Sequence, residues 1–183
     1  MRSPFAAVLA ALALAVPASA SDSLLYGGTE RDAIALGGSF LYDPATANGK
    51  DLSLELHGGY YVLDSFLVGG SFAVRDDDVA DTYELSALGQ YHFLNALDPQ
   101  NDRPWGVSPY AGLRLGVARG KDAAGGNTGA LAGLRLGIDL FLTDNIALDL
   151  AFDWSICSAK VYPDDYRLKK SDATLRLGLD FHF

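Results

Sequence analysis

Apolar side chains alternate with small or polar ones along most of the chain after residue 20. A period of two is typical of β-strands, whose successive side chains point to opposite faces. Clusters of Asp, Asn, Gly and Pro divide the pattern into eight segments, which are residues 32–42, 51–62, 66–75, 82–93, 107–118, 129–142, 146–156 and 173–183. No segment has the periodicity of an amphipathic helix. The pattern therefore predicts an all-β protein of eight strands.

The connections between these segments alternate in length. Residues 63–65 and 143–145 are tight turns, whereas four polar connections are longer: residues 43–50, 76–81, 119–128 and 157–172. One end of the structure is therefore expected to carry turns and the other end loops. The connection at residues 94–106 is an exception, because it is long where the alternation predicts a turn.

The two faces of the strands differ in composition. One face is apolar in all eight segments and carries no charge, as in the alternating leucines of residues 175–179. The other face combines many small residues and the three histidines, His57, His92 and His182, with these charged residues: Glu55, Glu84, Arg114, Arg135, Asp139, Asp149, Asp153, Arg176 and Asp180. Such a face suits the interior of a narrow barrel, which has room mainly for small residues and a few charges.

Aromatic residues on the apolar face concentrate near both strand ends. They are Tyr60, Phe66, Tyr91 and Phe93 toward the turns, and Tyr42, Phe72, Tyr83 and Trp154 toward the loops. Aromatic girdles flank the lipid band of membrane barrels. A membrane barrel turns its apolar face out to lipid, whereas a lipocalin-like barrel turns it inward around a ligand. The sequence predicts an eight-stranded antiparallel up-and-down transmembrane β-barrel, closed by pairing of its first and last strands.

The amino-terminal residues have the features of a secretory signal peptide. An apolar run over residues 5–16 follows a basic residue, and the small triplet Ala18-Ser19-Ala20 precedes the expected cleavage point. We expect residues 1–20 to be cleaved and residues 21–183 to form the barrel domain. The chain has 14 Lys and Arg against 23 Asp and Glu, a formal net charge of −9. This balance argues against nucleic acid as a partner, because phosphate binding needs a basic face.

The chain closes with "RLGLDFHF", which has a polar residue at Arg176, a glycine at Gly178, and aromatic residues at Phe181 and Phe183. With "SPYAGLRLGVA" at residues 108–118 and the two Asp-containing turns, it resembles the OmpA-like or opacity-type outer-membrane β-barrel families. The resemblance implies an outer-membrane location in a Gram-negative bacterium, surrounded by outer-membrane lipid and lipopolysaccharide. It also implies that the barrel-assembly machinery recognises the terminal motif. No peptidoglycan-binding domain follows in the sequence, so a cell-wall tether is not expected.

The charges on the polar face are the main candidates for function. The arginines and aspartates near mid-strand are expected to pair inside the barrel, because an unpaired charge there costs several kcal/mol. This network is interpreted as structural; alternatively, its pairs exchange and form a gate for water and small ions. The histidines share the inward face and none lies in a loop, so no general acid or base is placed to meet lipid. An enzyme is therefore not expected.

No cofactor or metal site is predicted. The acidic segment 76–81 lacks the glycine and terminal glutamate of an EF-hand loop and is interpreted as a solvated tip. Cys157 is interpreted as a small residue at the rim, with an exposed, crosslinking thiol as the alternative. The cations at the loop end are expected either to contact lipid phosphates or to be merely solvated; they are Arg119, Lys121, Lys160, Arg167, Lys169 and Lys170.

The predicted function is that of an integral outer-membrane protein with a structural or surface-interaction role and no catalysis. It would maintain envelope integrity, or contact an extracellular partner through its loops. A narrow passive channel for ions or small solutes is the first alternative. A soluble, lipocalin-like ligand-binding barrel is the second.

Overall fold

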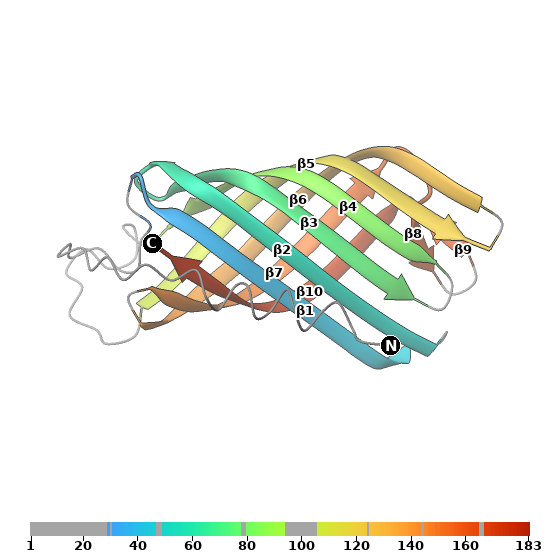
Figure 1. The fold of residues 1–183 in the computed structure, drawn as a ribbon, viewed down its shortest axis with the longest axis horizontal. Coiled ribbons are helices and arrows are strands. Elements are labelled where there is room, and N and C mark those ends of the chain that lie inside the picture. Colours follow the sequence, from blue (N-terminus) through green and yellow to red (C-terminus); the bar gives the residue numbers. More distant parts are fainter. Residues whose placement is uncertain are drawn as a thin grey trace, which may run out of the picture.

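The computed structural model describes residue 29 and residues 31–46, 49–77, 80–93, 106–123, 125–143, 145–164 and 167–183, without the side chains of residues 42–51, 164 and 167. The predicted signal peptide, residues 1–20, lies outside the described residues. Eight strands form a barrel (Figure 1): β1 (Ile34–Thr46), β2 (Gly49–Leu63), β3 (Phe66–Asp77), β4 (Asp81–His92), β5 (Gly106–Asp122), β6 (Gly125–Thr143), β7 (Ile146–Cys157) and β10 (Ser171–His182). Two short strands, β8 (Tyr162–Asp164) and β9 (Arg167–Lys169), form a separate hairpin.

The barrel is closed, and neighbouring strands are antiparallel all round it. The last strand, β10, pairs with β1 from Ala35 opposite His182 to Phe40 opposite Leu177. Closure leaves no sheet edge unpaired, which matters in lipid because each unsatisfied backbone group there costs several kcal/mol. The predicted eight-stranded up-and-down barrel is confirmed. Among the described residues, no helix is long and apolar enough to cross a membrane.

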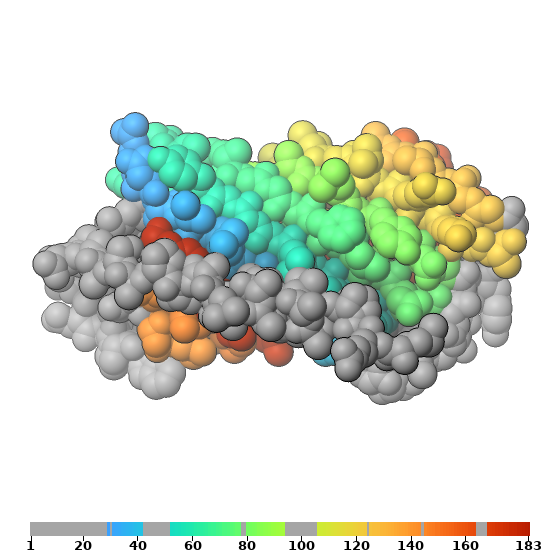
Figure 2. Space-filling view, in the orientation of Figure 1, coloured from blue at the N-terminus to red at the C-terminus, as the bar shows by residue number. Residues whose placement is uncertain are grey.

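Burial alternates residue by residue along the strands, as in β4. The buried rows carry the charges and the exposed rows carry leucine, valine, isoleucine and aromatic side chains; Leu115 on β5, for example, is 64% exposed. Figure 2 shows these outward side chains forming a continuous surface over β2, β3, β4 and β5. The apolar face therefore points outward, which contradicts the lipocalin-like alternative and leaves the membrane barrel.

The predicted aromatic girdles lie on this outward face. Tyr60, Tyr91 and Phe93 are exposed near the turn end, and Phe66 there is half-buried. Phe72, Tyr83 and Trp154 are exposed toward the loop end. The side chain of the remaining predicted member, Tyr42, is outside the description. The aromatic residues thus bracket an apolar band at two levels, where they are suited to the lipid interfaces.

The strands continue further at the loop end than the sequence predicts. Pairing of β1 with β2, of β3 with β4, and of β5 with β6 takes up most of the residues predicted as loops, leaving residues 47–48, 78–80 and 123–124 as the connections. The loop predictions at these three places are therefore largely wrong. Continued pairing gives each backbone N–H and C=O group a partner, and Gly125 reverses the chain with a φ of +147°, which other residues rarely adopt.

The fourth outward connection is long, as predicted, but it has a structure that the sequence did not indicate. Its residues 162–164 and 167–169 form the β8–β9 hairpin. Figure 1 places this hairpin at the same end of the barrel as the long β5–β6 hairpin. The irregular connection predicted at residues 94–106 falls almost wholly outside the described residues, since β5 begins at Gly106.

Candidate functional site in the barrel lumen

The charged residues predicted to share one lumen network lie inside the barrel and form two layers. We call the layer nearer the loop end the arginine layer; it comprises Arg114, Arg135, Arg176, Glu55, Glu84 and Asp153. We call the layer nearer the turn end the histidine layer; it comprises Asp139, Asp149, Asp180, His57, His92 and His182. The sequence placed all these residues on one strand face but did not separate the layers.

Arg135 on β6 reaches across the lumen to Glu55 on β2. Its Nη2 atom lies 2.5 Å from Glu55 Oε1 and donates a second hydrogen bond to Asp153 Oδ2 at 2.6 Å. Its Nε atom donates to Asp153 Oδ1 at 2.7 Å. Three strands separate β6 from β2 in either direction round the closed sheet. This ion pair therefore joins opposite walls of the barrel, so the lumen is only one side-chain pair wide here.

Arg114 on β5 and Arg176 on β10 complete the arginine layer. Arg114 donates to Glu84 Oε2 at 2.8 Å and to Asp153 Oδ2 at 3.1 Å. Arg176 Nε donates to the same Asp153 oxygen at 3.0 Å. Asp153 therefore accepts hydrogen bonds from all three arginines, and three carboxylates balance three guanidinium groups. Because burying an unpaired charge costs several kcal/mol, buried charges are expected to be balanced and hydrogen-bonded, as these are.

The histidine layer has a different charge balance. Asp139, Asp149 and Asp180 come from the adjacent strands β6, β7 and β10, and the first two are cross-strand neighbours in register. His57 Nε2 lies 3.1 Å from Asp180 Oδ1, and the Tyr110 hydroxyl donates to Asp149 Oδ1 at 2.7 Å. Within the described chain, no arginine or lysine forms an ion pair with these aspartates. The predicted pairing of arginine with Asp139 and Asp149 is therefore wrong, whereas that with Asp153 is correct.

Apolar side chains close the lumen at the turn end. Tyr61, Leu67 and Leu88 are buried in one cluster with two alanines. The Tyr61 ring lies 5.6 Å from that of His92, and Phe141 packs against His182 with ring centroids 5.1 Å apart. These apolar residues were not identified from the sequence as lumen residues. They could have been, because each occupies a strand position whose side chain points inward, between two positions of the outward apolar row.

The fourth outward connection folds back into the loop end of the lumen. Val161 and Tyr162 are buried against Ala118, Leu131 and Cys157. The backbone of this connection is held inside the mouth of the barrel, since the threonine hydroxyl of residue 82 donates to the residue 161 carbonyl at 3.0 Å. Burial raises the pKa of the Tyr162 hydroxyl, with the charge of a nearby glutamate adding to the effect. The connection is therefore a plug packed into the barrel mouth.

Cys157 belongs to this plug. Its side chain is 1% exposed and unpaired with any other cysteine. The alternative of an exposed, crosslinking thiol is therefore wrong, because the connection folds back over the residue. A small, partly open cavity of about 20 Å³ adjoins the plug, lined by residues that include Tyr162, Glu84 and Arg176.

Glycines on the inward face leave space for the charged layers. A Cβ atom on Gly37 would lie 2.0 Å from Asp180 Oδ1 and 2.4 Å from His57 Nε2, so a larger residue would displace this pair. At Gly178, a Cβ atom would lie 2.7 Å from the backbone oxygen of Gly38. Gly178 therefore permits the close approach of β10 to β1.

The predicted rim cations are partly described. Arg119, Lys121, Lys160 and Lys170 are exposed, and Lys169 is half-buried with its Nζ atom 3.6 Å from an Asp172 carboxylate oxygen. The side chain of Arg167 is outside the description. In the predicted acidic tip at residues 76–81, residues 78 and 79 are also outside it. These exposed cations lie at the loop end, together with acidic residues such as Asp76 and Asp122.

Comparison with known proteins shows the type of barrel. No family model matches the chain, and neither does any curated protein. Among solved structures, the N-terminal β-barrel domain of Pseudomonas aeruginosa OprF is 19% identical with a TM-score of 0.55, and the comparison covers 84% of this chain and 98% of that one. Neisserial surface protein A is 17% identical with a TM-score of 0.56, covering 82% and 96%.

A third similar structure is that of the outer-membrane protein OprG from Pseudomonas aeruginosa. It is 16% identical with a TM-score of 0.50, and the comparison covers 85% of this chain and 98% of that one. At such low identity, these likenesses concern the fold. The chain has the fold of the OmpA-like, eight-stranded outer-membrane β-barrels of Gram-negative bacteria, which confirms the type of barrel predicted from its sequence.

Proposed function

We propose that this protein is a structural outer-membrane barrel without a through-going pore or a catalytic centre. The observation that carries the proposal is the ion pair between Arg135 and Glu55, which spans the full width of the lumen. Both side chains are buried to within 1% of full burial. Separating such a pair leaves uncompensated charges and costs about 3–5 kcal/mol, so the closed lumen is the stable state.

The two ends of the lumen support the same conclusion. Tyr61 and its apolar neighbours fill the turn end, and Val161 and Tyr162 fill the loop end. A solute would have to pass both plugs and the arginine layer. The role of the protein then lies in its outer surface, in keeping envelope lipid and protein in place.

The loop end is the part suited to contacts with other molecules. The β5–β6 hairpin extends there with residues 125–128 exposed, and Arg119, Lys121 and Lys160 are exposed around it. Guanidinium and ammonium groups bind phosphate through charge-assisted hydrogen bonds. The phosphates of lipopolysaccharide or an acidic extracellular partner are therefore the contacts that this rim fits.

A narrow passive channel is the second candidate. The cavity of about 20 Å³ beside the loop-end plug favours it, because a space of this size holds a water molecule. The cavity ends at the arginine layer, where the side chain of Arg176 forms part of its lining. A channel therefore requires the arginine pairs to exchange partners.

Conductance in planar lipid bilayers tests the two candidates. We expect the purified wild-type barrel to insert without producing discrete current steps, because three separate barriers close its lumen. Arg135→Ala should also be silent, since both end plugs remain. Arg119→Ala is the matched control, because it removes an arginine side chain that is exposed at the loop end of β5.

Heat-modifiable migration on gels confirms that each variant is folded before its current is recorded. Regular current steps from the wild type would contradict the closed barrel. Steps from Arg135→Ala alone would show that the arginine layer is the barrier and that the two ends do not close the lumen by themselves.

A further inference from the structure

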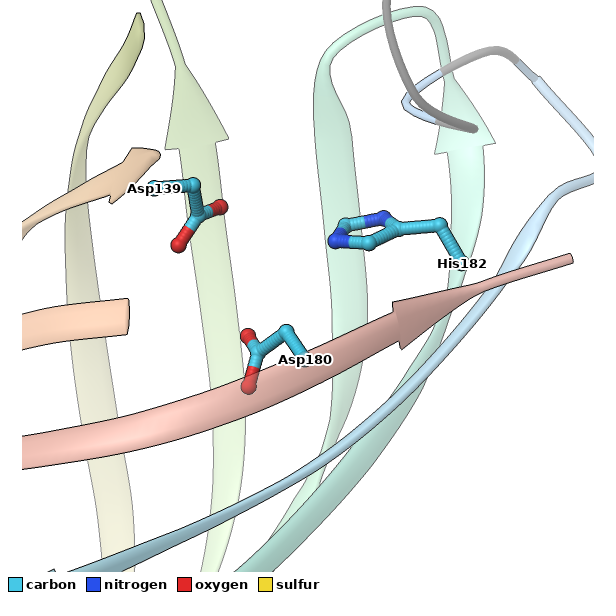
Figure 3. Close-up of side chains that lie close together, drawn as sticks. All are labelled: Asp139, Asp180 and His182. Atoms are coloured by element: carbon cyan, nitrogen blue, oxygen red, sulfur yellow. The ribbon is translucent and has the colours of Figure 1, made fainter. Parts of the chain in front are cut away.

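Three ligand-bearing side chains converge inside the histidine layer. Asp139 projects from β6, and Asp180 and His182 project from β10, as Figure 3 shows. One potential ligand atom from each lies within 4.8 Å of the others, and all three residues are buried. We propose that these residues bind a divalent metal ion of the zinc type in the barrel lumen.

The carboxylate of Asp139 is the strongest sign of a missing ligand. The residue is fully buried, and neither of its side-chain oxygens has a hydrogen-bond partner among the described residues. His92 Nδ1 lies 3.4 Å from Oδ2 without forming a hydrogen bond. Figure 3 shows the carboxylate directed into the space shared with Asp180 and His182. Buried polar groups are normally satisfied, so this orientation calls for a positive partner.

The charge of the histidine layer calls for the same partner. The arginine layer balances three carboxylates with three guanidinium groups, and its arginines are fully engaged there. The histidine layer contains three aspartates with no arginine or lysine paired to them in the described part of the chain. Protonation of the aspartates would remove negative charge, and protonation of the histidines would add positive charge. A divalent cation would balance the negative charge and would also bind the Asp139 oxygens.

The surroundings of Asp180 resemble the support that metal-binding carboxylates need. His57 Nε2 lies 3.1 Å from one Asp180 oxygen and 3.2 Å from the other, which fixes the orientation of the carboxylate. Gly37 leaves the space that this pair occupies. Groups that orient a ligand in this way commonly contribute tenfold or more to metal affinity. His57 is therefore a positioning residue, whereas Asp139, Asp180 and His182 are the ligands.

The donor set indicates the class of metal. Imidazole nitrogen suits zinc and the later first-row metals, and carboxylate oxygen is compatible with them, whereas Mg²⁺ and Ca²⁺ prefer oxygen alone. Two donors on one zinc ion lie at most about 4.4 Å apart, because each bond is about 2.0–2.2 Å long. The three potential ligand atoms all lie within 4.8 Å of one another, so small side-chain movements suffice to bring them onto one ion.

This site was not predicted from the sequence, which led us to expect no metal. Asp180 and His182 are two residues apart on one strand, a spacing that merely places them on the same face. Asp139 joins them only because β6 and β10 flank β7 in the closed sheet. The enclosed position also implies that the metal enters as the barrel folds.

Metal retention after refolding tests the proposal. The protein is refolded from urea into detergent micelles with Zn²⁺ present, free metal is removed by gel filtration, and zinc is measured by mass spectrometry. We expect about one Zn²⁺ per folded chain, as for a single site of this kind. Wild-type protein that folds but retains no zinc would overturn the proposal and would leave protons to balance the layer.

Ligand variants locate the metal. Asp139→Asn and His182→Gln preserve size and should reduce retained zinc at least about tenfold. Asp172→Asn is the matched control, because it changes an aspartate on the same strand whose carboxylate pairs with Arg75 at 2.9 Å; it should retain zinc like the wild type. Equal retention by the ligand variants would place the zinc elsewhere and refute the site.

Cobalt spectroscopy keeps the test decisive if a ligand variant does not fold. Wild-type protein refolded with Co²⁺ should show visible absorption bands that the hydrated ion lacks, and the Asp172→Asn protein should show the same bands. A folded wild-type protein without such bands would count against ligation by Asp139, Asp180 and His182.

Discussion

Gly137 lies opposite Tyr110 on neighbouring strands, and the tyrosine ring fills the space that a side chain at residue 137 would need. A Cβ atom there would lie 2.2 Å from the ring carbon Cζ. The same tyrosine donates its hydroxyl hydrogen to Asp149 in the histidine layer. The absence of a side chain at Gly137 therefore allows Tyr110 to take the position in which it binds Asp149.

The first prediction follows from this contact. Gly137→Ala should lower the free energy of unfolding by about 1–3 kcal/mol, because the tyrosine must move in a filled lumen. Urea titration in lipid vesicles, followed by tryptophan fluorescence, measures the change. Gly89→Ala is the control, since a Cβ at residue 89 meets only the Phe66 ring at an ordinary 3.9 Å. Equal effects of the two substitutions would show that crowding at Tyr110 is not the cause.

At the next scale, the end of β10 is fastened to two other elements. Phe183 and Ile34 exchange backbone hydrogen bonds of 2.8 and 2.9 Å, which extends the β1–β10 pairing beyond the last strand residue. On the other side, Asn145 accepts from the His182 backbone N–H and donates through its side chain to the His182 carbonyl. The last residues thus close the barrel through their backbone, whereas recognition of the Phe183 ring by the assembly machinery is an expectation from the sequence.

The second prediction separates these two roles. Phe183→Ala should fold in detergent much as the wild type does, because its backbone hydrogen bonds remain. In cells, the amount of folded barrel in outer membranes should fall several-fold if the assembly machinery reads the terminal aromatic. Heat-modifiable migration of membrane fractions measures this amount. Leu179→Ala, in the same outward row, is the control, and an equal fall with that variant would contradict recognition of the terminal ring.

The elements also show how far the sequence could predict the structure. Each of the eight alternating segments corresponds to one barrel strand, because the period of two and the uncharged outward row follow directly from chain geometry. The strand ends at the loop side were not predictable in this way. Polar residues such as Asn127 and Thr128 are exposed on a strand that protrudes from the membrane, and such residues give the same pattern in a loop.

The candidate site was predicted in part for a similar reason. Whether a side chain points into the lumen depends on its position in the alternating pattern of the strand, which can be read from the sequence. The division into two layers depends on how far each strand is shifted against its neighbour round the barrel, as when Arg135 meets Glu55 from the opposite wall. Such shifts are set by closure of the whole sheet. These shifts cannot be predicted from the sequence of any single strand.

At the scale of the whole molecule, charged side chains face the lumen and apolar side chains face the surrounding lipid. The lumen holds every charged residue of the two layers, while the outer wall carries exposed apolar residues such as Leu113 on β5, which is 61% exposed. In water this arrangement would expose a large apolar surface, which soluble monomers avoid. In a bilayer the same surface is solvated by lipid, and the charges are shielded by the sheet.

The last prediction tests this orientation through position along one strand. Leu113→Arg, near the middle of the apolar band, should lower folding stability in lipid vesicles by about 2–4 kcal/mol, whereas Val107→Arg, one residue after β5 begins, should cost about 0–1 kcal/mol. Urea titration in vesicles measures both values. In detergent micelles, which deform around a charge more easily than a bilayer does, the difference should shrink. A barrel that buried its apolar face would also be destabilised by Leu113→Arg, because the charge would enter the core, but to the same extent in vesicles and in detergent. The dependence on lipid is therefore the decisive quantity.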